Sequence, residues 1–521
     1  MNNSQLNPLG QQFADAIQRA HAERDQAVKH AHISETMHVI GAGRTLTAAY
    51  EQLRNAAEYT EEHLLLQRAI RRFYKRLFLS RDEKRVGLCG AELITELTLA
   101  GYLTNDSVPT DTVDRISQTS LRYFAAHHAI SRNYKLQPRS EEWVTAVLAV
   151  EIEGYVNNLS DRAVFVQFAY DYFKTSINQS TLSLENTTNY DISLFIATHR
   201  SLMKSDYATI RHALLERYQQ TPENIDAFMQ TNLSIDSLIA SKDVEKLTRL
   251  VNRYGAPLRI LWRIEQEHPE SMSSLTQPDK FLELYRQQIA DEYVQMNDRI
   301  NRGVIKSVLF LFITKLLIGV SIEVPADYLM HGMILWLPLA INLLFPPLYM
   351  ILLRLTLALP GQSNTEALVD RIEALLYSPK TVPIVVRADT GQHTSAFNVV
   401  YALFFLLVFG AAGFGLWLLE FTAVHLLIFF VFLSTASFLG FRLSRMIREI
   451  ETVDTHQNGI SLVRDFLYLP FVVVGRWISE KYSRVNLVAT VLDMVIELPL
   501  KTVLNLIRQW GMFISSKKDE L

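Results

Sequence analysis

The stretch Gly303–Pro325, GVIKSVLFLFITKLLIGVSIEVP, decides the fold class of this chain. About 20 predominantly apolar residues are enough to cross a bilayer as a helix. Between Lys306 and Glu323 the stretch is apolar except for Ser307, Thr314, Lys315 and Ser321. It therefore predicts a first membrane span over residues 303–324.

Lys315 lies near the centre of this predicted span. A lysine at that depth costs about 3 kcal/mol on insertion scales, so it normally faces other helices or a wet cavity. One interpretation is a lysine paired for packing, or a span shifted so that Lys315 reaches the membrane surface. The other is a permeation or coupling site, and the sequence leaves both open.

Three further apolar runs predict spans over residues 332–353, 399–419 and 421–441. The second carries no charge, and its only strongly polar side chain is Asn342. Its prolines at 338, 346 and 347 lack a backbone donor, so we expect them to bend or break the helix. The last two runs would form one helix about 65 Å long, twice the hydrocarbon thickness, so they predict a hairpin near Glu420.

Lysine and arginine in the connections predict the orientation of these spans. The connection at 323–331 and the turn at Glu420 have none. Ten lie on the other side: Arg286, Arg299, Arg302, Arg354, Arg371, Lys380, Arg387, Arg442, Arg445 and Arg448. Because basic residues favour the cytoplasmic side, both termini are expected in the cytoplasm.

Residues 1–295 read as a succession of amphipathic helices without a regular run of strands, which predicts an all-α cytoplasmic region of one or two bundles. One of them has a basic face formed by Arg68, Arg71, Arg72, Lys75 and Arg76. We expect a solvated face partnered by Glu58, Glu61 and Glu62. Contact with nucleic acid or anionic headgroups is the alternative.

Residues 442–521 form an apolar but interrupted tail. Its charge-free stretch Phe466–Gly475 is too short to cross a bilayer. We expect amphipathic helices that lie in the interface or pack beneath the bundle. The final Lys518–Leu521, KDEL, would then be cytoplasmic and out of reach of a lumenal receptor. The N-terminus also lacks the pattern of a secretory signal.

Motifs that would name a reaction are weak. Charge is nearly balanced, 51 basic against 54 acidic residues, and the single cysteine excludes an intramolecular disulfide and a cysteine-based zinc site. Gly41-Ala42-Gly43 lacks the third glycine of a dinucleotide loop, since Leu46 stands there. Spacing argues against metal binding at six histidines: His21, His30, His32, His38, His127 and His128. We predict no catalytic, cofactor-binding or metal residue.

Four segments resemble a family of uncharacterised bacterial multi-pass integral membrane proteins associated with candidate-phylum bacteria. They are AIRRFYKRLFL (69–79), LFLFITKLLIGVSIEVP (309–325), LAINLLFPPLYMILLRLTLALPG (339–361) and the run from Asp465 to Leu504. The resemblance is strongest over the C-terminal 220 residues. It implies a bacterial cytoplasmic membrane and brings no activity and no functional residue.

The sequence thus predicts an all-α protein with a helical cytoplasmic region, a four-span bundle and C-terminal interfacial helices. The expected function is a membrane-anchored scaffold or interaction protein. Its expected partners are the bilayer and a protein bound by the cytoplasmic region, with a homo-oligomer left open and no specific nucleic acid. The alternative is a small transporter or channel subunit using Lys315, Asn342 and His425. A lipid-directed enzyme would have Asp493 and Glu497, on one helix face, as its nearest candidates.

Overall fold

The computed structural model shows an all-helical chain. Apart from two isolated β-bridges, no strand occurs among the described residues. These are residues 5–41, 44, 47–48, 51, 64–133, 135–157, 159–182, 184–379, 383–384, 395–452 and 459–484. The chain divides into two compact units, described separately here. The helical unit comprises residues 11–175 and 184–251, and the span unit comprises residues 1–10, 176–183 and 252–484.

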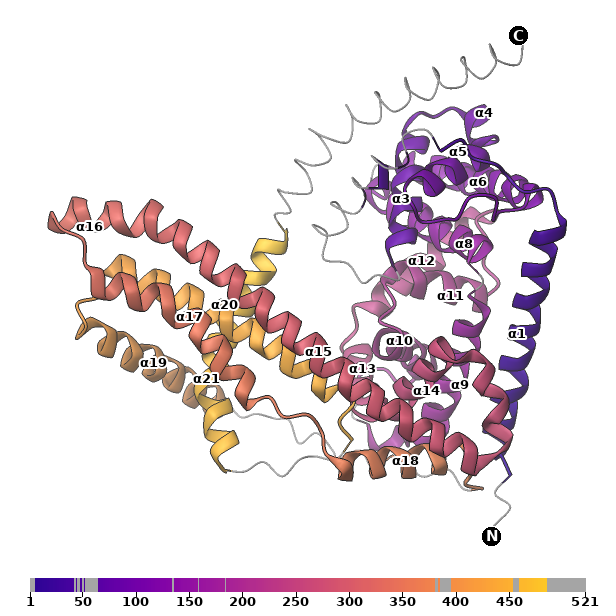
Figure 1. Ribbon diagram of the computed structural model, residues 1–521. Coiled ribbons are helices and arrows are strands. Elements are labelled where there is room, and N and C mark those ends of the chain that lie inside the picture. The colour runs from indigo at the N-terminus through magenta and orange to yellow at the C-terminus, as the bar shows by residue number, and fades with distance from the viewer. Residues whose placement is uncertain are drawn as a thin grey trace. The chain divides into compact units, whose positions relative to one another are not determined.

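Helices with buried apolar faces build the helical unit (Figure 1). They are α1 (Pro8–Ile33), α3 (Leu65–Leu79), α4 (Glu83–Val86), α5 (Cys89–Leu99), α6 (Thr110–Ser131), α7 (Gln137–Ser140), the π-helix η2 (Glu141–Thr145), α8 (Ala146–Val156), α9 (Ser160–Ser176), α10 (Tyr190–Leu202), α11 (Tyr207–Arg217), α12 (Ile225–Ile239) and α13 (Lys242–Tyr254). Helix α8 is buried over its first five residues and packs against α3, α6 and α11. The unit therefore has a hydrophobic core of its own.

The basic face of α3 is paired with acidic residues from other parts of the helical unit. Arg72 pairs with Glu51 at 2.6 Å, and Lys75 pairs with Glu141 at 2.7 Å. Arg76 pairs with Glu96 at 2.5 Å. The predicted partners at positions 58, 61 and 62 lie outside the described residues. The face is thus neutralised from several helices, which a search along one helix does not reveal.

Among its described residues, the span unit contains ten helical segments besides the short 3₁₀ turn η3 (Gln179–Thr181). They are α14 (Ala256–Glu267), η4 (Pro269–Thr276), α15 (Pro278–Ile318), the π-helix η5 (Gly319–Glu323), α16 (Val324–His331), α17 (Trp336–Thr356), α18 (Gln362–Tyr377), α19 (Ser395–Trp417), α20 (Ala423–Arg448) and α21 (Gly459–Arg484). Helices α15, α17 and α20 lie side by side (Figure 1). Leu311, Met350, Phe432 and Ala436 form a buried core among them.

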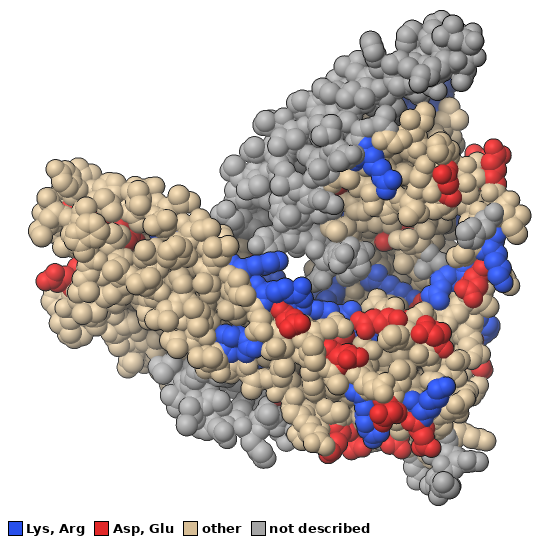
Figure 2. Space-filling model, in the orientation of Figure 1, with Lys and Arg blue, Asp and Glu red and all other residues tan. Residues whose placement is uncertain are grey.

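The prediction of four spans is confirmed at the level of length and composition. Four helices are long and apolar enough to cross a membrane, within 278–331, 336–356, 399–417 and 423–448. The hairpin near Glu420 is present, and Glu420 takes a left-handed conformation with φ 64°. Figure 2 shows a wide surface over α16 and α17 that is nearly free of charged side chains. Such a surface is what lipid tails contact.

The first span differs from its prediction. Instead of ending near residue 324, the helical path continues for 54 residues from Pro278 to His331. It passes through the π-turn η5 and stops at Gly332, whose φ of 69° is left-handed. Pro325 does not end it, because a proline in the first turn of α16 follows the break in regular hydrogen bonding at η5. The predicted connection at 323–331 is therefore helical, and the predicted boundary between residues 295 and 303 falls inside α15.

Prolines do not break α17, although breakage was one of the predicted outcomes. Pro338 lies in its first turn, and Pro346 and Pro347 lie inside the helix. A proline at position i cannot donate to the carbonyl at i−4. The main-chain carbonyl of Asn342 therefore has no helical donor from Pro346.

The tail helix α21 packs along the side of α20. A side chain on Gly475 would place its Cβ 2.0 Å from the carbonyl oxygen of Ser434, near the middle of α20. Phe471 stacks against Phe430, with 6.3 Å between the ring centroids. The prediction was a helix in the interface or beneath the bundle. The close approach allowed by Gly475 holds α21 against the side of α20, and the position of the tail relative to the membrane stays a prediction.

A second layer of helices packs around the N-terminal half of α15. Arg354, at the end of α17, donates hydrogen bonds to Asn297 and Asn301, both at 2.7 Å. Asn364 on α18 contacts the Tyr293 hydroxyl at 2.9 Å and the Ile450 carbonyl at 3.0 Å. These contacts tie α18 and the ends of α17 and α20 to one face of α15.

Candidate functional site

Charged and polar side chains meet inside the span bundle. Lys315 on α15 is 1% exposed and forms an ion pair with Oε1 of Glu323, which is fully buried at the end of η5. The two residues lie eight positions apart on one helical path, so they are about two turns apart. The Lys315 ammonium also lies 5.1 Å from the centroid of the Phe432 ring. Lys315 thus has the geometry of the paired-lysine interpretation.

Asn342 joins this ion pair to α20. Its Nδ2 donates to Glu323 Oε1 and to the main-chain oxygen of His425, both at 3.2 Å. Asn342 is fully buried on α17. One amide therefore links η5, α17 and α20, which the sequence separates by up to 102 residues. A buried amide with two acceptors in reach is costly to replace by an apolar side chain, because those acceptors lose their donor.

His425 and Asp327 form the second half of this group, which we name the polar cluster: Lys315, Glu323, Asp327, Asn342, Thr422 and His425. Nε2 of His425 lies 3.4 Å from Asp327 Oδ2, and both side chains are buried. Asp327 also accepts a hydrogen bond from the backbone of Leu335 at 3.1 Å. Nδ1 of His425 lies 3.0 Å from Thr422 Oγ1. Thr422 is the N-cap of α20, so the same hydroxyl caps the start of the helix and positions the His425 ring.

Several buried polar atoms of this region have no hydrogen-bond partner. They are Glu323 Oε2, Asn342 Oδ1, His425 Nε2 and Ser434 Oγ. Unpaired polar atoms in an apolar interior are costly and uncommon. With His425 neutral, Lys315 contributes one positive charge, and Glu323 and Asp327 contribute two negative charges. The polar cluster then has a net charge of −1 in an environment that disfavours any net charge.

The structure brings together three of the five predicted site residues: Lys315, Asn342 and His425. Asp493 and Glu497 lie outside the described residues. Glu323 and Asp327 were missed because they were assigned to a connection. A usable signal was present, since Lys315, Glu323 and Asp327 recur at spacings of eight and four and share a face if the helix continues.

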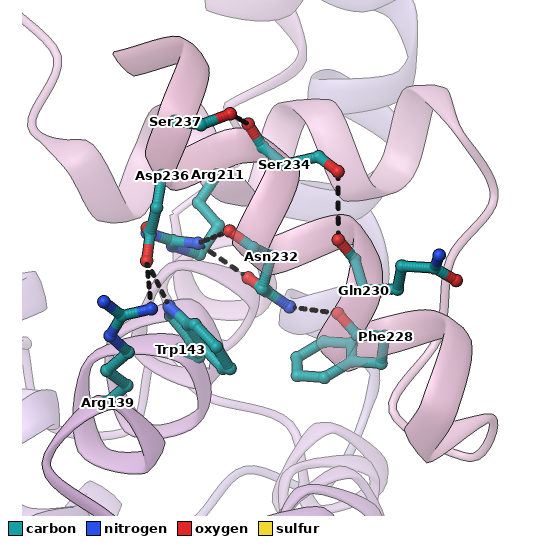
Figure 3. Close-up of polar contacts among 9 residues, drawn as sticks. All are labelled: Arg139, Trp143, Arg211, Phe228, Gln230, Asn232, Ser234, Asp236 and Ser237. Atoms are coloured by element: carbon teal, nitrogen blue, oxygen red, sulfur yellow. Dashed lines mark hydrogen bonds and ion pairs between the residues drawn. The ribbon is translucent and has the colours of Figure 1, made fainter. Parts of the chain in front are cut away.

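A second polar network lies inside the helical unit (Figure 3). Arg211 is 1% exposed and forms an ion pair with Asp236. It also donates to the side chain of Asn232 at 2.8 Å, and Trp143 Nε1 donates to Asp236 at 3.1 Å. Helices α11 and α12 and the π-helix η2 meet here. The network holds these three helices together, which fits a structural role.

Two titratable groups are buried near each other in the helical unit. Burial lowers the pKa of His199 to about 3, with a further contribution from the positive charge of Arg162. Burial raises the pKa of Glu153 to about 7, against the opposing effect of Arg162. Ser205 lies between His199 and Arg162, 3.2 Å from His199 Nδ1 and 2.9 Å from Arg162 Nη2. A neutral histidine that is already hydrogen-bonded fits a structural role.

A surface groove of about 730 Å³ lies between α6 and α8. Its polar lining includes Arg115, Arg122, Glu151 and Tyr155. The Arg115 guanidinium lies 4.0 Å from the centroid of the Tyr155 ring. Arg122 is shared between Glu151 at 3.4 Å and Glu223 at 3.2 Å. Stacked arginine and tyrosine are typical of protein-binding surfaces.

Comparisons with protein-family models, curated proteins and solved structures find no match to this chain.

Proposed function

We propose that the protein is a membrane-anchored scaffold or interaction protein. The observation that carries this proposal is the distribution of the candidate spans between the two units. All four candidate spans lie in the span unit. In its described residues the helical unit has a hydrophobic core and no candidate span. A folded, span-free unit attached to a bundle is the arrangement that an anchored interaction module requires.

The proposed location is a bacterial inner membrane, with both termini and the helical unit in the cytoplasm. Exposed basic residues at one end of the bundle support this orientation: Arg302, Lys306, Arg442, Arg445 and Arg448. The resemblance to bacterial multi-pass proteins supports the choice of membrane.

Cysteine labelling tests the orientation. With Cys89 replaced, His331→Cys and Ser363→Cys should label from opposite sides, since both positions are exposed and belong to different ends of the spans. Asp327 is unsuitable because it is 1% exposed and belongs to the polar cluster. Labelling of both positions from the same side would contradict the proposed topology.

The groove between α6 and α8 is the proposed contact surface for a protein partner. Arg115 stacks on Tyr155, and its charge faces a groove that also holds the shared Arg122. Arginine and tyrosine supply large contact areas and donors for carboxylates. A partner with an acidic and aromatic segment matches this chemistry.

Affinity capture of the full chain from native membranes tests the scaffold proposal. The variant Arg115→Glu reverses the charge in the groove, and Lys84→Glu is the matched control because Lys84 is exposed on α4. A specific partner should be captured by wild type and by the control, and lost with Arg115→Glu. Equal capture by all three proteins would remove the groove from the proposal, and no stoichiometric partner at all would contradict the scaffold function.

A second candidate function is transport or conduction coupled to an ion. The buried polar cluster favours it, because ionisable residues within spans commonly mark ion and proton pathways. Flux in reconstituted vesicles tests it, with several ions and pH gradients. A flux above empty liposomes that is lost in Asn342→Leu, while the protein stays folded, would support transport over scaffolding.

A further inference from the structure

We infer that His425 and Asp327 form a proton-binding site within the span bundle, which takes up one proton and brings the polar cluster from a net charge of −1 to zero. The inference goes beyond the scaffold proposal and does not require transport. It rests on the geometry of two buried side chains and on the charges around them.

Thr422 contacts the other nitrogen of the ring. Its hydroxyl oxygen accepts from the backbone N–H of His425 and lies 3.0 Å from Nδ1, where the hydroxyl can donate to a bare Nδ1 or accept from an Nδ1–H. Thr422 is therefore a hydrogen-bond partner for both the neutral and the charged ring. Nε2 faces Asp327 Oδ2 at 3.4 Å. The histidine is held ready to form a full ion pair with the carboxylate.

Other charged groups near the pair do not neutralise it. Lys315 on α15 is paired with Glu323 at the end of η5, so their charges cancel. The contribution of α17 is Asn342, whose amide does not titrate. Glu420, in the turn before α20, and His331, at the end of α16, are exposed to solvent. The negative charge of Asp327 is thus left without a compensating positive charge until a proton arrives.

Uptake of one proton would bring the net charge of the polar cluster to zero. A proton added to the bare ring nitrogen gives an imidazolium, in which Nδ1–H donates to Thr422 Oγ1 and Nε2–H faces Asp327. Asp327 keeps its hydrogen bond from Leu335 N–H and gains a charged partner. The ion pair would tie the connection between α16 and α17 more firmly to the start of α20. If the proton resides on Asp327 instead, the pair has still taken up one proton and the cluster is still neutral.

Nuclear magnetic resonance of the full chain in lipid nanodiscs, with ¹⁵N-labelled histidine, tests the inference. The chain has 14 histidines, so His425→Gln identifies the signal of His425 by difference. The exposed residue variant His331→Gln is the matched control, since it removes one signal and leaves the cluster intact. Between pH 9 and pH 5 the His425 ring should change from a singly protonated, neutral form to the doubly protonated form. In Asp327→Asn, which lacks the negative charge, the ring should stay neutral over this range.

Infrared difference spectra between the same pH values cover the other location of the proton. A protonated-carboxyl band that appears in wild type and is absent from Asp327→Asn also supports the site. A band lost instead in Glu323→Gln would place the proton on Glu323 and overturn the inference. Spectra in which neither the ring nor the Asp327 carboxyl changes between pH 9 and pH 5 would overturn it as well.

Discussion

Breaking the Lys315–Glu323 ion pair from one side should cost far more stability than removing both charges together. Lys315 is 1% exposed and Glu323 is fully buried, so water does not screen the pair. Removing one partner of a buried pair typically costs about 3–5 kcal/mol, because a charge is left without compensation. In Lys315→Met, Glu323 keeps only the hydrogen bond from Asn342 at 3.2 Å, so we expect about 3–5 kcal/mol.

Glu323→Gln should cost less, about 2–3 kcal/mol, since the Lys315 ammonium still faces the Phe432 ring at 5.1 Å. The double variant Lys315→Met/Glu323→Gln should lie within about 1 kcal/mol of wild type. Methionine has a similar length to lysine, and glutamine still accepts from Asn342. The two changes are therefore non-additive by at least about 4 kcal/mol.

Reversible unfolding in mixed micelles of increasing SDS content, followed by circular dichroism, measures these differences. Lys306→Met is the matched control, because Lys306 is exposed on the same helix, and it should change stability by less than about 0.5 kcal/mol. A double variant as unstable as the sum of the single variants would refute the coupling.

Three further predictions concern other parts of the chain. The pKa of Glu153 is raised by burial from 4.5 to about 7, so its contribution to stability is present below pH 4.5 and lost as the pH rises to 7, amounting to about 3 kcal/mol. The pKa of His199 is lowered by burial from 6.5 to about 3, so its contribution, about 5 kcal/mol, is present above pH 6.5 and lost toward pH 3. Between pH 4.5 and 6.5 the two groups change stability with pH in opposite directions. Glu153→Gln should therefore make thermal stability rise with pH in this range, and His199→Gln should make it fall. Unchanged pH profiles would contradict both assignments. Asp236→Ala should destabilise the helical unit by about 2–3 kcal/mol, because buried Arg211 loses its carboxylate partner; the cost is reduced because Asp236 is 29% exposed. Asp236→Asn should cost less. Equal stability of the variants and wild type in chemical denaturation would show that this network does not stabilise the unit. Gly475→Ala should cost about 1–3 kcal/mol of stability, because its Cβ would lie 2.0 Å from the α20 backbone. A cysteine crosslink between α20 and α21 should also form less readily in this variant. Crosslinking as ready as in the wild-type background would count against this contact.

The sequence identified the spans because their signal is local. A run of about 20 apolar residues is visible without knowledge of the fold, and four such helices occur in the structure. Lys315, Asn342 and His425 stood out for the same reason, as polar residues within apolar runs. Their partnership could not be predicted, since it depends on how α15, α17 and α20 pack.

Glu323 and Asp327 show why local rules fail at one point. Two acidic residues and a proline after an apolar run are typical of a loop. The π-turn η5 changes that interpretation, because it accommodates the break at Pro325 and lets the helix continue to His331. Both carboxylates then point into the bundle instead of toward solvent. The misassigned stretch is the part of the chain that supplies the negative charges of the polar cluster.

The presence of these charges bears on the choice between the two proposed functions. An anchor that only has to stay in the membrane is at least as stable with well-packed apolar residues as with a buried ion pair. The Lys315–Glu323 pair can still be explained by a need for a unique helix register, since charges and an amide from η5, α17 and α20 meet at one point. The proposed proton site at Asp327 and His425 is harder to explain in that way, because a unique helix register does not require a group that binds a proton. If its proton uptake is measured and no flux accompanies it, the bundle is an anchor whose packing responds to protons; if flux accompanies it, the same pair belongs to a transport path.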